Sequence, residues 1–370
     1  MRGMILCSWD NRLGVNVDAK YPENVLEGLN DDDILTLFTT HALGGESGIL
    51  SMTMKRINVV SYYTGKPKDE TESQFIVALF LSEGDEPKKY EEYLSAISSN
   101  LIRSIDKEGF MDFFVDCYEA AITNPGITEE QIYATIMRDE LNQFILELLR
   151  EGPITKMELA KYLSKELNKR VTEIDEYIRP LIQNKFVEHY AVSEGGRVTS
   201  EYLFLIKDID VLRSPTLNIA INLYYYKTDS VLRADFQAAM DDFFNKYEPT
   251  PSDKELLIDF LSNPGTYEII RILRQGYVRS DELISRMGFE MRNIYNNLER
   301  LGSSSIVMPI KDEFGSIWLC LLSDIHAISI FPEYMVDRIQ KSWEKGILED
   351  EIAIKHLEFL RREYAKTLQE

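Results

Sequence analysis

Apolar and polar positions in the first 105 residues follow the periods of a small α/β domain. Short runs rich in β-branched and aromatic residues predict five strands. Two stretches with helical spacing predict one helix after the second strand and another after the fifth. The expected strands lie at 4–9, at 11–22, as a pair within 48–66 and at 74–82, and the expected helices lie at 30–44 and 86–105.

From residue 128 onward the pattern predicts one set of elements twice. Each set has three helices followed by a two-stranded hairpin. We interpret the second set as a diverged repeat of the first. The first set comprises helices at 128–152, 153–167 and 172–186 and a hairpin at 187–206. The second comprises a helix at 252–276 that is interrupted at Asn263-Pro264-Gly265, helices at 278–288 and 289–302 and a hairpin at 305–322.

Two further helical stretches complete the pattern. One helix is expected at 230–247, before a linker at 248–255 that contains Pro249 and Pro251. One or two amphipathic helices are expected at 332–370. The residues expected to dock this C-terminal stretch on another helix are Ile352, Leu357, Leu360 and Tyr364.

The order of two strands, a helix, three strands and a helix in residues 1–118 resembles the longin and roadblock folds. These are profilin-like modules of small-GTPase regulators and vesicle-traffic adaptors, and they carry no catalytic motif. The alternative for this region is an unrelated five-stranded α/β domain. Three helices followed by a hairpin resemble the winged-helix form of the helix-turn-helix. Tandem winged helices occur in archaeal and bacterial transcription regulators, and also in ESCRT-II adaptors, where they bind proteins.

These patterns and resemblances predict an α+β protein with several domains, for which 370 residues are long enough. The predicted segments are a longin/roadblock-like domain at 1–118, a first winged-helix domain at 125–213, a helical connector and Pro-containing linker at 214–251, a second winged-helix domain at 252–330 and C-terminal amphipathic helices at 331–370.

The sequence contains no motif that indicates catalysis or the binding of a cofactor. It lacks the P-loop, GxGxxG, GxSxG and HExxH patterns. Cys7, Cys117 and Cys320 are far apart and form no metal-ligand spacing with the four histidines. We therefore predict a protein that is not an enzyme and has no catalytic, cofactor-binding or metal site. Because no apolar run reaches the length of a membrane span or of a signal peptide, we expect a cytoplasmic protein.

One helix has the composition of a DNA-reading helix. In 289–302, Ile294, Leu298 and Leu301 are expected to face the core of the second winged helix. Arginine and asparagine side chains can form paired hydrogen bonds with guanine and adenine edges, and a lysine on the hairpin can contact a phosphate. The residues expected to face solvent and to bind DNA are Arg292, Asn293, Asn296, Asn297, Arg300 and Lys311.

The charge of the chain disfavours that use. The formal net charge is -21, and acidic residues exceed basic ones in every third of the chain. DNA binding depends on several cationic contacts with phosphates, each of which releases a counterion. In the first copy, the equivalent helix is expected to present Glu173, Asp175, Glu176 and Arg179. Protein partners with basic surfaces are therefore more natural for this chain than nucleic acid.

Three functional hypotheses follow, of which the third is an enzyme whose site carries no recognised motif. In the first, the protein is a cytoplasmic scaffold or adaptor that acts through protein–protein contacts, and the longin/roadblock resemblance implies a small GTPase as one class of partner. In the second, it is a DNA-binding transcriptional regulator that uses helix 289–302. The roadblock resemblance also implies pairing of two copies as a homodimer.

Overall fold

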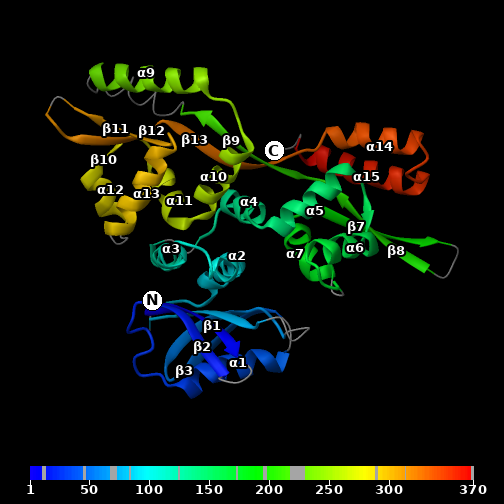
Figure 1. Cartoon of the computed structure of the whole chain (residues 1–370), viewed down its shortest axis with the longest axis horizontal. Coiled ribbons are helices and arrows are strands. Elements are labelled where there is room, and N and C mark those ends of the chain that lie inside the picture. Colours follow the sequence, from blue (N-terminus) through cyan, green and yellow to red (C-terminus); the bar gives the residue numbers. More distant parts are fainter. Residues whose placement is uncertain are drawn as a thin grey trace. The chain divides into compact units, whose positions relative to one another are not determined.

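The structure is a computed structural model, which describes residues 1–10, 14–44, 47–66, 73–82, 85–123, 126–171, 174–194, 198–216, 230–287, 291–312 and 314–367. These residues form a mixture of helices and strands (Figure 1), in agreement with the α+β class at that coarse level. The chain divides into two compact units. Unit 1 comprises Met1–Thr135 and Arg213–His326, and unit 2 comprises Ile136–Leu212 and Ala327–Glu370.

The N-terminal part of unit 1 is a five-stranded antiparallel sheet with the strand order β2-β1-β5-β4-β3. Helix α1 after the second strand and helix α2 after the fifth lie in the expected positions, and a further helix, α3, follows α2. The bounds are β1 Gly3–Asp10, β2 Gly14–Tyr21, α1 Asp31–Gly44, β3 Gly48–Met54, β4 Ile57–Tyr63, β5 Phe75–Phe80, α2 Lys88–Ser104 and α3 Phe110–Thr123.

Both faces of this sheet are covered. Successive side chains of a strand point to opposite faces, and in the central strands successive residues are buried. One face packs against α1, where Cys7 and Ala78 lie in a core with Leu37 and Phe38. On β5, Val77 and Leu79 flank Ala78 and point to the opposite face, and both are also fully buried. Helix α2 lies over β3, β4 and β5 on that side (Figure 1), and the Tyr93 hydroxyl donates to the Cys117 carbonyl of α3 at 2.6 Å.

Unit 1 also contains a helical module with a small sheet, which we call the second module (residues 264–321). Three helices precede a hairpin, as expected, and the short strand β10 completes a sheet of order β10-β12-β11. Helix α9 packs on β11 and places Phe236 and Met240 in the core. The bounds are α9 Ser230–Lys246, α10 Pro251–Ser262, α11 Pro264–Leu273, β10 Val278–Arg279, α12 Ser280–Met287, α13 Met291–Ser303, β11 Val307–Lys311 and β12 Ile317–Leu321.

Unit 2 contains the first module (residues 140–205) and the C-terminal helices. Its sheet has the order β6-β8-β7, with α15 packed against it through a core of Phe204, Ile206, Ile352 and Phe359. The bounds are α5 Glu140–Glu151, β6 Ile154–Thr155, α6 Lys156–Glu166, α7 Ile174–Gln183, β7 Val187–Glu194, β8 Val198–Leu205, α14 Tyr334–Glu344 and α15 Asp350–Thr367. Three remaining elements are α4 Glu129–Arg138 and the paired strands β9 Asp208–Pro215 and β13 Ser323–Ile330.

The two modules share details beyond their element order. Each third helix ends in a residue with positive φ, 59° at Lys185 and 55° at Ser305, which is the left-handed turn of a Schellman cap. The next N–H then donates five residues back, from Phe186 to Leu181 and from Ile306 to Leu301, both at 2.9 Å. The Phe186 and Ile306 carbonyls in turn accept hydrogen bonds from the N–H groups of Ile206 and Leu322, which lie at the ends of the two hairpins. These matched bonds support the interpretation of a repeat.

Three sequence-based expectations were wrong in detail. The helix expected at 128–152 is two helices, because the Asp139 carboxylate accepts from the Leu141 and Asn142 N–H groups and so begins a new helix. Strands β9 and β13 were not predicted. In α15, Ile352 and Leu360 are buried as expected, but Leu357 and Tyr364 are exposed, and Phe359 lies in the core in their place. The hairpin turn at 195–197 lies outside the described residues.

Candidate nucleic-acid or protein interface

Helix α13 is the helix for which DNA binding was considered. Ile294 and Leu301 are fully buried, and Leu298 is partly buried, as the sequence predicts. Its N-terminal approach, residues 288–290, lies outside the described part of the chain. Helix α13 packs against α11, so the polar residues on its other sides decide what it can bind.

Two of the predicted DNA-contacting residues are not at the surface. Asn293 is 7% exposed and Asn297 is 4% exposed. The Asn297 side chain donates from Nδ2 to Oδ2 of Asp116, which belongs to α3, at 3.2 Å. The expectation that these asparagines face solvent is therefore wrong, because it considered α13 within the second module alone and could not include the contact of Asn297 with α3.

The contact between α3 and the second module is close. Asn263 caps α11 by accepting from the Gly265 and Thr266 N–H groups, at 2.8 and 3.1 Å. Gly265 follows in the first turn, and a Cβ atom there would lie 2.8 Å from Asp116 Oδ2 and 2.6 Å from Asn297 Nδ2. Glycine at 265 thus allows the approach of the Asp116 carboxylate.

Burial raises the pKa of Asp116 to about 6, and the repulsion of Asp112 adds to this effect. Hydrogen bonds from Asn297 and Asn263 and the charge of Arg300 oppose it without reversing it. A carboxylate in this position is costly to keep ionised at neutral pH. The contact is therefore sensitive to protonation of one side chain.

A third predicted DNA contact, Arg300, is already engaged. Its guanidinium pairs with Asp259 at 2.5 Å and lies over the Phe260 ring at 5.3 Å from the centroid. Arg292, Asn296 and Lys311 are exposed as expected. Arg292 and Lys311 have no carboxylate partner among the described residues. Of the six predicted residues, Arg292, Asn296 and Lys311 are therefore the three that are exposed and have no ion pair or side-chain hydrogen bond among the described residues.

The hairpin of the second module presents apolar side chains to solvent. Asp312 holds the turn by accepting from Phe314 N, Ser316 N and Trp318 Nε1, at 2.8–2.9 Å. The hydrogen bond from Trp318 is the main cause that holds the pKa of Asp312 below its usual value. Phe314 is 93% exposed and Ile317 is 50% exposed. On α13, Tyr295 is also exposed.

In the first module, the equivalent helix α7 is acidic at its surface. Asp175, Glu176 and Arg179 are exposed as expected, while Glu173 lies outside the described residues. Lys156 of α6 contacts both Asp175 and Glu201, each at 2.6 Å. This surface places carboxylates where a DNA-binding module places cations.

A second polar cluster in unit 1 is a set of ion pairs around Arg274. Arg274 pairs with Glu130 at 2.6 Å and with Asp324 at 2.8 Å, and His326 lies 3.4 Å from each carboxylate. Burial alone would raise the pKa of Glu130, but hydrogen bonds from His326, Arg274 and Tyr267 and the charge of Arg274 lower it to about 2. The first module has the corresponding pair, Arg150 with Asp208 at 2.8 Å. Because the pair recurs at the same place in both modules, we assign it to the repeat fold.

The described residues contain no group of three His, Cys, Asp or Glu residues that could hold a metal ion. All three cysteines are buried, and burial raises the pKa of the Cys320 thiol to about 12. The buried His41 ring lies 2.9 Å from Ser61 Oγ, and burial lowers the pKa of His41 to about 4. Within the described ranges no helix is long and apolar enough to cross a membrane.

Sequence reasoning missed the exposed Phe314 and the buried pair Asn293 and Asn297. A phenylalanine between an acidic residue and Gly315 in a tight turn is a local signal that could have been found. The burial of the asparagines had no local signal. The chain matches no known protein-family profile, and no curated protein is significantly similar to it.

Proposed function

We propose that this protein is a non-enzymatic adaptor or scaffold that acts through protein–protein contacts. The longin/roadblock-like order of elements in its N-terminal part makes a small GTPase one class of partner to test. Two winged-helix-like modules joined to such a part provide several separate surfaces. The proposal concerns the mode of action, which is recognition by surface complementarity instead of chemistry.

One observation carries the proposal. Asn293 and Asn297, two of the three asparagines of α13 that could read adenine, are buried, and Asn297 is hydrogen-bonded to Asp116 of α3. The module instead exposes Phe314, Ile317 and Tyr295. Aromatic side chains are enriched in protein interfaces, where they bury a large area at a low entropic cost. These exposed side chains therefore support a protein partner.

The charges on α12, α13 and the hairpin also favour a protein partner over DNA. A DNA-binding module neutralises several phosphates, and each cationic contact contributes to affinity and to its salt dependence. On α12 and α13, Arg286 and Arg300 pair with Glu282 and Asp259. Arg292 of α13 and Lys311 of β11 are also exposed, but so is the acidic Glu299 of α13. This supply is small for a site that must attract DNA to an acidic protein.

The second candidate function is DNA binding through α13. It is favoured by the exposure of Arg292, Asn296 and Lys311 without carboxylate partners among the described residues. A titration of the full chain into a fluorescent mixed-sequence duplex at low salt separates the two functions. The adaptor proposal expects no saturable binding, and it expects Arg292→Ala and Lys311→Ala to change nothing. Binding that weakens steeply with salt and is lost in both variants would instead establish the second function.

A further inference from the structure

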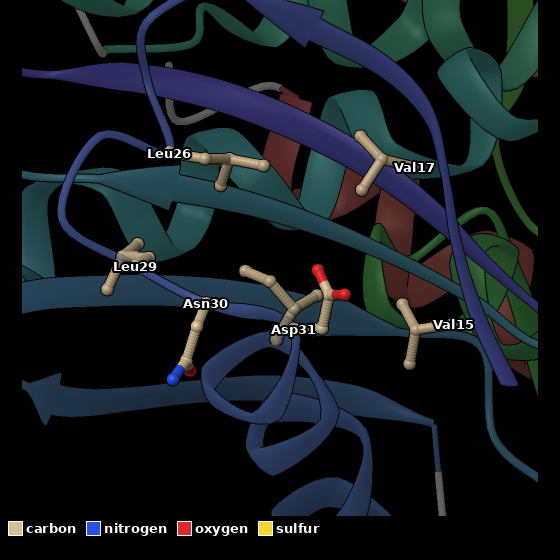
Figure 2. Close-up of a pocket in the computed structure, with 7 residues that line it drawn as sticks. Val15, Val17, Leu26, Leu29, Asn30 and Asp31 are labelled. Carbon is tan, nitrogen blue, oxygen red and sulfur yellow. The ribbon is translucent and has the colours of Figure 1, made fainter.

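A shallow pocket lies beside the N-terminus of α1, at the edge of the N-terminal sheet. Its volume is about 160 Å³. Five of its seven lining residues are apolar, and the residues come from β2, from the loop that precedes α1 and from α1 itself. The lining residues are Val15, Val17, Leu26, Leu29, Asn30, Asp31 and Ile34. Figure 2 shows the Asp31 carboxylate directed into the space between Leu26, Val15 and Val17, whereas the Asn30 amide points away from them.

The pocket adjoins an open strand edge. Strand β2 is the first strand of the order β2-β1-β5-β4-β3, and among the described residues it pairs with β1 only. A register shift opposite Leu6 and Cys7 places an extra residue, Asp18, in β2, so the regular part of the edge is Gly14–Val17. Val15 and Val17 alternate with Asn16, which puts both valine side chains on the α1 face of this edge. An edge of this kind leaves backbone donors and acceptors that an added strand can use.

The surroundings of the pocket are acidic. Asp31, Asp32, Glu23 and Glu27 are all exposed. The nearby cations have partners, since Lys55 pairs with Asp33 at 2.5 Å and Lys20 pairs with Glu23 at 3.0 Å. Neither Asp31 nor Asp32 has a cationic partner within the described part of the chain. A ligand that lies along β2 would therefore meet apolar side chains next to unneutralised carboxylates.

We propose that β2 and this pocket bind an extended peptide segment of a partner protein in which an apolar and a basic residue lie two positions apart, so that both side chains face α1. The segment adds to the sheet as a sixth strand beside β2 and places an apolar side chain between Val15, Val17, Leu26 and Leu29. A basic side chain of the segment pairs with Asp31. Strand addition supplies the backbone hydrogen bonds, and the pocket and the carboxylate supply the selectivity. The inference rests on the proposed adaptor function, because it names the partner chemistry of one of its surfaces.

Charge selects this occupant over a second copy of the chain. A second β2 strand would bring its own Asp31 and Asp32 to the same edge, and like charges in an interface oppose association. Nucleic acid is disfavoured for the same reason. The peptide must therefore supply cations, which a basic residue two positions from the apolar one does.

The test uses the full chain and a fluorescent nine-residue peptide in which valine and lysine occupy the odd positions in turn and threonine occupies the even positions, so that valine and lysine share one face of the strand. We expect saturable binding. Asp31→Asn weakens it about fivefold and Asp31→Lys at least about tenfold, since the variants remove or reverse a charge next to the ligand. The matched control is Asp337→Lys, which makes the same charge change at another exposed acid in the first turn of a helix, α14. Asp337→Lys should alter the affinity less than about twofold.

A second peptide tests the added strand. Methyl groups on alternate backbone nitrogens remove the donors of one edge, and we expect them to weaken binding at least about tenfold. Amide hydrogen exchange of the complex should show new protection within residues 14–17. No saturation up to about 1 mM peptide would overturn the proposal, as would equal losses in Asp31→Lys and Asp337→Lys. If the peptide fails while Phe314 and Ile317 variants still reduce capture of a partner, the β2 site is wrong and the adaptor function stands.

Discussion

Asn297 of α13 donates a hydrogen bond to the carboxylate of Asp116 of α3 across a separation of 181 residues in the sequence. This bond ties the helix with the composition of a DNA reader to the last helix of the N-terminal part. It removes an asparagine from the surface, and it places an ionisable group in a buried contact. Both consequences can be measured.

The first prediction concerns Asp116 and pH. Its pKa in the folded protein is about 6, above the ordinary value near 3.8, so the folded state binds this proton more tightly than the unfolded state. Stability from this group is therefore fully present below pH 3.8 and is lost as the pH rises through 6. Asp116→Asn should raise the free energy of unfolding by about 2–3 kcal/mol at pH 7.5 and by little at pH 3.5. Denaturant unfolding at the two pH values measures this.

The matched control for that experiment is Asp112→Asn, which removes an exposed charge one turn earlier on the same helix. We expect it to change stability by no more than about 0.5 kcal/mol at either pH. An Asp116→Asn variant that is less stable than the wild type at pH 7.5 would show that the buried carboxylate is favourable as an anion, against the account given above.

The second prediction concerns Gly265. A methyl group at this position would lie within 3 Å of both Asp116 and Asn297, so Gly265→Ala should destabilise the protein by about 2 kcal/mol. In the Asp116→Ala background the clash with the carboxylate is gone, and the loss should shrink by about 1 kcal/mol or more. Thermal or denaturant unfolding of the four proteins of this cycle gives the coupling.

The control for Gly265→Ala is Gly302→Ala on α13. An added Cβ there meets only the Val307 carbonyl oxygen, at 3.8 Å. Alanine at a helical position is favoured over glycine by roughly 0.5–1 kcal/mol, so this variant should be at least as stable as the wild type. Equal losses from both substitutions would argue against a specific contact at Gly265.

The third prediction concerns Glu130, whose pKa is lowered to about 2 by His326 and Arg274. Stability from a depressed carboxyl pKa is present above the ordinary value of 4.5 and is lost as the pH falls from 4.5 towards 2. Glu130→Gln should therefore cost about 2–3 kcal/mol at pH 7, and the difference from the wild type should narrow steadily below pH 4.5.

Glu129→Gln is the comparison, since Glu129 is the exposed neighbour on the same turn of α4. It should cost less than about 0.5 kcal/mol at pH 7. If the two glutamine variants behave alike across the pH range, the cluster around Arg274 does not hold Glu130 as an anion.

The elements and their repeat could be read from the sequence because their causes are local. Periodic apolar residues set α13 and the hairpins, and Leu149-Arg150 with Gly152 recurs as Leu273-Arg274 with Gly276. Both glycines adopt positive φ, at 155° and 151°, and both arginines pair with an aspartate that follows the hairpin. This recurring Leu-Arg-x-Gly sequence could have been noticed without the structure, and it marks the two arginines that form the matched ion pairs.

The site was predicted less well because its geometry depends on distant residues. Amphipathic spacing placed Ile294 and Leu301 inward correctly, but it could not show that Asn293 and Asn297 are buried too, or that Asn297 contacts α3. Nor could it show that Arg300 pairs with Asp259, 41 residues earlier. The break at Asp139 differs, since an aspartate before a new apolar period is a local capping signal.

The most direct test of the adaptor function is capture of partners from a native lysate with the full chain, with and without nuclease treatment. Three baits are compared: the wild type, a Phe314→Ser and Ile317→Ser double variant, and Leu43→Ser, which replaces another highly exposed apolar residue in unit 1. We predict a protein that is recovered by the wild type and by Leu43→Ser, depleted at least about fivefold by the double variant, and unaffected by nuclease. Recovery that is lost on nuclease treatment, or that is equal for all three baits, would contradict the account.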